Sequence, residues 1–391
     1  MSGPIFNFEH NYLSSEMLEG LSNYKYSAID TNPLSIYIMH PFWNSLVKFC
    51  PKWIAPNLIT FVGFLLTVVA FLLLSFYDFN FYATSESEGY PPIPNWVFFA
   101  VGVLIFVAYT LDGIDGKQAR VTKTCGPLGE LFDHGLDSWT AVLIPTCLYS
   151  VFGRSPHSVP PLRFYFVTWN VFLTFYLTHW EKYITSVLFL PWGYDLSMLS
   201  TTGVFLFTSW YGVDFWKIYV SDTISTGHVL EIIFYLTSIC ATLPVTLYNI
   251  RKSYINKTGK DLPVLEALRP LAALIALMFI TCVWVITSKN DIINYHPRAF
   301  YMLTGTIFSN ITCRLVIAQM SGTRCSAWNP LLNVLIIAML VSLTIPYIET
   351  IIVYFLWAFV TYSQIHYGTC VVRQLCDHFR IECFRIKKQS K

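Results

Sequence analysis

Charged residues are scarce in this sequence. Only 12% of its 391 residues are Asp, Glu, Lys or Arg, whereas an ordinary soluble domain has roughly 25%. This scarcity argues against a soluble globular protein. The 25 basic residues also barely outnumber the 23 acidic ones, so the chain lacks the basic excess that nucleic-acid binding needs. We therefore expect no nucleic-acid partner.

The sequence also lacks paired cysteines. Its ten cysteines are scattered, and none belongs to a C-x-x-C pair, the spacing typical of zinc sites and redox motifs. We expect these thiols to be reduced and mostly structural.

Apolar residues, by contrast, make up 54% of the chain. A membrane-spanning helix needs about 20 consecutive apolar residues, and ten segments of this kind can be found. The sequence therefore predicts an all-α, polytopic integral membrane protein with about ten transmembrane helices. The expected spans lie at about 57–77, 94–113, 129–152, 162–181, 196–214, 227–250, 267–287, 297–320, 328–346 and 348–368.

The segments outside the spans complete the predicted organisation. The stretch 32–53 is apolar and aromatic, but Pro41 and Lys48 interrupt it. It is too short to span and is expected to lie in the membrane interface. The predicted parts are a cytosolic N-terminus with this interfacial helix at 1–56, a transmembrane catalytic domain at 57–368 with its motif at 112–137, and a basic cytosolic tail at 369–391.

The distribution of Lys and Arg predicts the orientation. An even number of spans puts both termini on the same side of the membrane. Placing the N-terminus in the cytosol leaves 18 basic residues in cytosolic segments and 5 on the opposite side, as the positive-inside rule requires. We therefore expect both termini and the motif at 112–137 to face the cytosol.

Four aspartates gather where the second span ends and the third begins. Asp112 and Asp115 are three residues apart, and Asp133 and Asp137 are four apart, so each pair shares one face of a helix. Carboxylates near a bilayer are costly and indicate a functional site. A carboxylate set without thiolates suits hard cations. We predict that these four residues bind two Mg²⁺ or Mn²⁺ ions, which could clamp a diphosphate.

Small and basic residues accompany the aspartates. Gly116, Ala119 and Gly129 have little side-chain bulk where a ligand must approach the backbone. Arg120 offers a bidentate fork for phosphate. We predict that these four residues bind substrate.

His134 lies between the two acidic pairs, with Glu130 one helical turn before it. A glutamate in that position can accept the imidazole N–H and raise the basicity of the ring. We expect His134 to be the general base for a hydroxyl nucleophile, supported by Glu130. The alternative is a structural hydrogen bond within the hairpin, since a position near metals does not establish proton transfer.

Together these residues resemble the signature of the CDP-alcohol phosphotransferase family. The signature reads D-x-x-D-G-x-x-A-R, eight residues, then G-x-x-x-D-x-x-x-D, and the chain matches every position from Asp112 to Asp137. The resemblance implies an Mg²⁺- or Mn²⁺-dependent transfer of an alcohol phosphate from a CDP-alcohol to a second alcohol, with CMP leaving. It also implies that His134 is the proton acceptor, supported by Glu130, as in eukaryotic choline and ethanolamine members.

The resemblance extends beyond the motif. Family members open the first span with a Pro-Asn-Leu-Ile-Thr run whose asparagine contacts the nucleotide. Asn57 stands at that position, where a helix cap is the alternative role. The most similar passages match ethanolamine-using members, which implies CDP-ethanolamine and diacylglycerol as substrates and a homodimer in the endoplasmic reticulum or Golgi membrane. These passages are 24–28, 30–35, 40–43, 179–183, 190–195 and 365–368.

Several alternatives stay open at this point. A choline-using or dual-specificity member has the same motif, although choline members carry glutamine where Glu181 stands. Glu181 could receive the ammonium of ethanolamine or pair with Lys182 or a neighbouring helix. A cation-coupled transporter would need carboxylates near the membrane midplane in two repeats. A prenyl-diphosphate transferase would have its acidic runs farther apart, without the small-residue pattern.

Overall fold

The computed structural model describes residues 9–85, 89–190 and 192–386. Almost all of the secondary structure in these residues is helical. The exceptions are the two-residue strands β1 (Ala28–Ile29) and β2 (Leu188–Phe189), which pair in parallel. The predicted all-α class is confirmed. Residues 1–8 of the predicted N-terminal region, residue 191 and residues 387–391 of the predicted tail lie outside the described residues.

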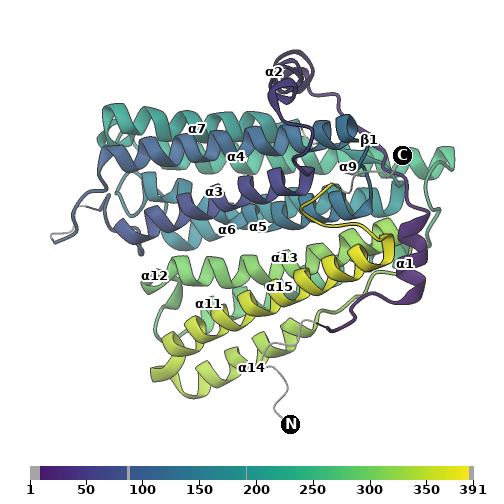
Figure 1. Cartoon of the computed structure of the whole chain (residues 1–391). Helices are drawn as coiled ribbons and strands as arrows, with labels where there is room; N and C mark the ends of the chain where they lie inside the picture. The colour runs from purple at the N-terminus through teal and green to yellow at the C-terminus, as the bar shows by residue number, and fades with distance from the viewer. Residues whose placement is uncertain (1–8, 86–88, 191, 387–391) are drawn as a thin grey trace, which may run out of the picture.

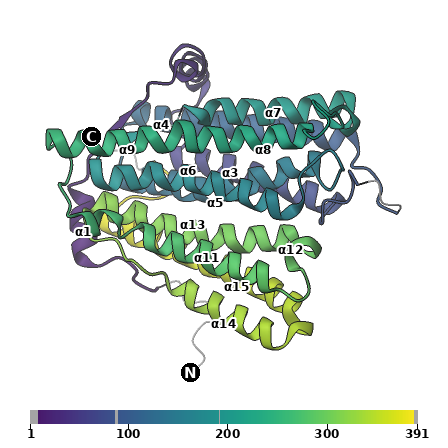
Figure 2. The same ribbon diagram turned by 180° about the vertical axis from the view of Figure 1, so that it is seen from behind.

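Long helices run side by side through the whole described structure (Figures 1 and 2), one at each predicted span. Their bounds are α3 (Pro56–Tyr77), α4 (Asn95–Thr122), α5 (Pro127–Phe152), α6 (Pro161–Thr185), α7 (Gly193–Tyr211), α8 (Thr226–Leu236) continued through η4 (Thr237–Thr242) into α9 (Leu243–Asn256), α11 (Leu271–Thr287), α13 (Pro297–Ser321), α14 (Pro330–Thr344) and α15 (Glu349–Phe379).

Short helices connect and flank these long ones. They are α1 (Ser15–Ser22), η1 (Ser35–Met39), α2 (His40–Leu46), η2 (Val47–Phe49), η3 (Val213–Trp216), α10 (Val264–Leu268), α12 (Ile292–Tyr295) and η5 (Pro346–Ile348).

Length and composition support a membrane protein. Among the described residues, five helical segments are long and apolar enough to cross a membrane, and α11 and α14 are shorter apolar helices. The five are α3, α4, the continuous segment α8–α9, α13 and the segment Pro346–Phe379.

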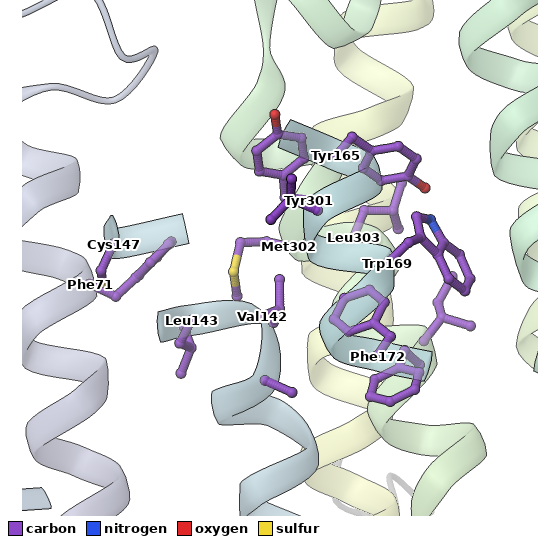
Figure 3. Packing of buried hydrophobic residues seen from close by; sticks show 14 of the residues in the cluster. Phe71, Val142, Leu143, Cys147, Tyr165, Trp169, Phe172, Tyr301, Met302 and Leu303 are labelled. Carbon is purple, nitrogen blue, oxygen red and sulfur yellow. The ribbon is translucent and has the colours of Figure 1, made fainter. Parts of the chain in front are cut away.

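Helix α13 forms the centre of the molecule and packs against α5, α6 and α15. All of its residues except Arg314 are buried. Aromatic rings of α6 lie against it (Figure 3), and the rings of Phe172 and Phe308 stack with their centroids 4.3 Å apart. A side chain at Gly305 would overlap Val142 of α5, so this glycine allows α13 and α5 to approach closely.

Helices α4 and α5 form the hairpin that carries the motif. Helix α4 ends at Thr122, and the next residue, Lys123, has a left-handed backbone (φ 59°) and donates its N–H to the carbonyls of Ala119 and Arg120. Pro127 then begins α5, where its fixed φ suits the first helical position. The predicted second span stops at residue 113, but α4 continues to Thr122, so one helix carries every motif residue from Asp112 to Arg120.

Helix α2 lies across the long helices. It is seen end-on in both overall views, while the long helices run across the page (Figures 1 and 2). Trp43 is buried, and a side chain at Gly113 of α4 would overlap its indole ring. Nearby Tyr37, Phe49 and Trp53 are exposed. This geometry favours the predicted interfacial helix, which remains a prediction.

Helix α15 continues past the predicted end of the transmembrane domain. It runs to Phe379, so the first part of the predicted tail at 369–391 is helical. The reason is that Cys370, Val371 and Leu375 recur at helical spacing and are buried against the other helices. Beyond Phe379 the chain turns back toward α3 (Figure 1).

Candidate active site

The α4–α5 hairpin brings the four predicted aspartates together. Asp112, Asp115 and Asp133 each offer an oxygen within 4.8 Å of the others, and the same holds for ligand atoms of Asp133, His134 and Asp137. Because Asp133 belongs to both groups, the four carboxylates form one continuous cluster.

Neighbouring groups bond two of these carboxylates and leave an oxygen of a third without a partner. The Tyr194 hydroxyl of α7 donates to Asp112 at 2.8 Å. Thr60 of α3 donates to Asp115 at 2.5 Å, and the Gly116 backbone N–H also bonds that carboxylate. The Oδ1 atom of Asp133 is buried and has no hydrogen-bond partner among the described residues.

Within the described residues, lysine and arginine side chains do not pair directly with the cluster. Across the part of the chain that the structure describes, none of the four aspartates forms an ion pair with Lys or Arg; the nearest cationic candidate is His134 Nδ1, 3.9 Å from Asp133. Carboxylates this close repel one another unless a cation or protons intervene. The four carboxylates and the unpartnered buried oxygen therefore fit hard divalent cations.

The small residues of the motif leave room beside the carboxylates. Apart from the adjacent residues and the helix's own backbone, no described atom lies within 4 Å of where a side chain at Gly116 would begin. At Gly129, Asn57 Oδ1 is the one such described atom that comes that near, at 3.6 Å. Ala119 and Arg120 follow on α4, where the Arg120 side chain is exposed. The hairpin therefore has open backbone and a guanidinium at its solvent-facing end.

Asn57 sits beside this hairpin rather than capping its own helix. Ala55 is the N-cap residue of α3, and no side chain forms a capping bond there. The Asn57 side chain lies next to Gly129, and its Nδ2 donates to Cys383 Sγ at 3.7 Å. The position of Asn57 favours the predicted role in substrate binding over the cap.

The expected hydrogen bond from His134 to Glu130 is not found among the described residues. Glu130 instead accepts bonds from Lys182 Nζ of α6 and, at 2.6 Å, from the Tyr24 hydroxyl. The side chains of Glu130 and Lys182 are 6% and 2% exposed. A buried ammonium needs a counter-charge, which explains why Lys182 takes this carboxylate. Burial and the nearby carboxylate raise the pKa of Tyr24, so this phenol stays a donor.

His134 packs on a second histidine that the motif does not include. Its ring meets the ring of His179 edge-on, with centroids 4.9 Å apart. His179 Nδ1 in turn lies 3.4 Å from the Gln319 amide nitrogen. His134 is thus held in a largely buried position beside Asp133, with packing rather than Glu130 fixing its ring.

Glu181 faces α9. It is buried and lies beside Thr246 and Asn249 of α9. Of the roles considered for Glu181, pairing with a neighbouring helix agrees with the structure, and receiving the ammonium of ethanolamine does not.

The site contains five contributors that the motif does not reveal: Tyr24, Thr60, His179, Lys182 and Tyr194. A lysine at the inner end of an apolar span is itself a signal, because a buried charge requires a partner. The identity of that partner has no local signal, since Glu130 and Lys182 are 52 residues apart.

Comparison with known proteins gives consistent matches. Residues 53–221 match the model of the CDP-alcohol phosphatidyltransferase family. The chain is 46% identical to Ethanolaminephosphotransferase 1 of Homo sapiens, over 97% of this chain and 96% of that protein. The mouse protein of the same name is 47% identical over the same shares. Choline/ethanolaminephosphotransferase 1 of Arabidopsis thaliana is 29% identical, over 97% of this chain and 99% of that protein.

The buried Lys182–Glu130 pair gives a prediction about stability. Replacing Lys182 with Met leaves the Glu130 carboxylate buried without its counter-charge. We expect the free energy of unfolding to fall by about 3 kcal/mol. The double variant Lys182→Met/Glu130→Gln removes both charges and should recover most of that loss. The measurement is thermal unfolding of the purified protein in detergent.

Arg324→Met is the matched control for this series. It breaks the more exposed Arg324–Glu266 pair and should leave the melting temperature nearly unchanged. A double variant as unstable as Lys182→Met alone would contradict the assigned pairing.

Proposed function

The chain belongs to the CDP-alcohol phosphatidyltransferase family, and we propose that it transfers phosphoethanolamine from CDP-ethanolamine to diacylglycerol, producing phosphatidylethanolamine and CMP. The observation that carries this proposal is the cluster of Asp112, Asp115, Asp133 and Asp137 on one hairpin, without a balancing cation from the described protein. The choice of ethanolamine rests on 46–47% identity over nearly the full length with relatives of that name.

The proposed cofactor is a pair of Mg²⁺ or Mn²⁺ ions. Asp112, Asp115 and Asp133 would hold one ion, and Asp133 and Asp137 would contribute to the other. Bound divalent cations neutralise the charge of a diphosphate and of its leaving group. The four carboxylates and the unpartnered Asp133 Oδ1 support this assignment.

The residues of the chain have distinct proposed tasks. Arg120 and Asn57 bind the nucleotide portion, and Gly116, Ala119 and Gly129 let it approach the helix backbones. A ring nitrogen of His134 takes the proton of the diacylglycerol hydroxyl. The freed oxygen attacks the β-phosphorus, and the bond from that phosphorus to the oxygen bridging to the α-phosphate breaks, so that CMP leaves. Glu130 acts indirectly, by holding Lys182 and Tyr24 beside this helix.

The cellular setting is part of the proposal. The excess of basic residues in the segments assigned to the cytosol supports a multi-pass protein with both termini and the active site facing the cytosol. The water-soluble nucleotide would then enter from the cytosol and the lipid from the bilayer. We infer an endoplasmic reticulum or Golgi location and a homodimer from the family resemblance.

Two alternatives differ in how the structure bears on them. A choline or dual specificity keeps the same site, and the Arabidopsis relative carries both headgroups in its name. A cation-coupled transporter would need acidic groups in two repeats. The four aspartates instead occupy a single hairpin, which favours the enzyme.

The proposed reaction predicts a defined product. Membranes from cells without their own choline and ethanolamine transferases, supplied with this protein, diacylglycerol and Mg²⁺, should form phosphatidylethanolamine from labelled CDP-ethanolamine. CDP-choline should give much less product under the same conditions. Equal amounts of product from the two donors would contradict the assigned headgroup specificity. No product from either donor, with the protein inserted in the membrane, would contradict the proposed reaction.

The carboxylate cluster predicts metal binding that can be measured without turnover. Asp133→Asn should weaken Mn²⁺ binding by at least about tenfold, because one charge-assisted metal contact is lost from both groups. Electron paramagnetic resonance of free Mn²⁺ in titrations of the purified protein gives the affinity. The control is Asp222→Asn, an exposed aspartate outside the cluster. Unchanged affinity in Asp133→Asn would rule out the assigned ligands.

The role of His134 predicts a loss in the chemical step. His134→Ala should lower kcat by roughly 10²- to 10⁴-fold, the range of general-base catalysis, while KM for CDP-ethanolamine changes little. Steady-state kinetics in detergent–lipid micelles separate the two constants. A loss of less than about tenfold, with normal Mn²⁺ binding, would leave His134 with only a structural role.

A further inference from the structure

The chain beyond α15 returns to the active site. Arg380 has a left-handed backbone (φ 55°) that ends α15. Residues 381–385 then run across the start of α3, visible as the yellow loop beside that helix in Figure 1. This segment is far from the motif in sequence, but it is adjacent to it in space.

Contacts to α3 anchor one side of the segment. Arg385 forms an antiparallel bridge with Ile54, just before the helix begins. Cys383 Sγ accepts a hydrogen bond from Asn57 Nδ2 at 3.7 Å. The ring of Phe384 packs on Phe61, with centroids 5.5 Å apart. The segment therefore touches three consecutive parts of the α3 entry.

Contacts to α5 anchor the other side. Phe384 also meets Phe132 edge-on at 5.7 Å, one residue before Asp133. Cys383 packs against the apolar cluster that includes Leu128 and Leu131. The same short segment thus bridges the helix that carries Asn57 and the helix that carries the second aspartate pair.

We propose that the C-terminal segment Ile381–Arg385 forms one wall of the nucleotide-binding site and positions Asn57 and the first turns of α5 for the CDP-alcohol. The inference rests on the proposed function, because it takes the substrate to be a nucleotide bound near Asn57. Cys383 and Phe384 are positioning residues in this view.

The geometry indicates that the segment borders the nucleotide-binding site and does not block it. An asparagine amide has two N–H donors and an acceptor oxygen, so Asn57 can bond Cys383 and still contact a ligand. The thiol is also a weak acceptor that competes poorly with a phosphate or base oxygen. The space beside Gly116 remains open, because no described atom outside the adjacent residues and the helix's own backbone lies within 4 Å of the start of a side chain there. The segment borders the space next to the carboxylates and does not fill it.

The first experiment separates binding from chemistry. Phe384→Ala should raise KM for CDP-ethanolamine, and its Kd by calorimetry, roughly three- to tenfold, with kcat and the KM for diacylglycerol nearly unchanged. The matched control is Asp377→Ala, which removes an exposed side chain near the end of α15, before the segment. An unchanged KM and Kd for CDP-ethanolamine would overturn the proposal, and so would an equal rise in KM for both substrates.

The second experiment fixes the segment in place. Residues of an antiparallel bridge lie close enough for a disulfide, so Ile54→Cys/Arg385→Cys should cross-link under oxidation, as peptide mass spectrometry can verify. The cross-linked protein should keep its Kd and kcat. Loss of activity that a reductant restores would identify an inhibitory plug, and failure to cross-link would show that the segment does not rest there.

Failure of the proposed function is distinguishable from failure of this inference. Wild-type protein that binds CDP-ethanolamine but forms no product would count against the reaction alone. The binding constants of Phe384→Ala and of the cross-linked protein would then still decide the place of the segment.

Discussion

A charged group removed from water must meet a counter-charge or hydrogen-bond partners, because its desolvation costs several kcal/mol. Only 12% of the residues of this chain are charged, and two of its buried cations show how the condition is met. Lys182 is paired with Glu130, and the fully buried Arg298 donates to the carbonyls of Asp78 and Phe79. The aspartate cluster differs, because four carboxylates lie together and none of them forms an ion pair with a lysine or arginine of the described residues. This concentration of negative charge marks the place where the protein requires a ligand.

The apolar framework makes such a concentrated cluster possible. Four carboxylates would repel one another apart if their helices were free to separate. Helix α13 is buried along its length and packs closely on α5 at Gly305, while Thr60 and Tyr194 bond the carboxylates from α3 and α7. Packing energy in the centre therefore holds charges together at the end of the hairpin.

Sequence reasoning succeeded where the determining interactions are local. Apolar runs predict the helices, since each must satisfy its own backbone in a membrane, and the three- and four-residue spacing of the aspartates places each pair on one face. It failed where partners are distant. Glu130 was expected to serve His134, four residues away, but Lys182 and Tyr24 bind it from 52 and 106 residues away. The C-terminal contacts with Asn57 span 326 residues.

These distant contacts share a physical function. The hairpin supplies the carboxylates, but separate segments contact it from several sides: Tyr24 from the N-terminal region, Tyr194 from α7 and Phe384 from the C-terminal segment. A soluble nucleotide and a membrane lipid need a site that is open to water and bilayer yet geometrically fixed. Chain segments at the end of the hairpin meet both needs. They border the site and hold it in place, and they add no bulk between the helices that face the lipid.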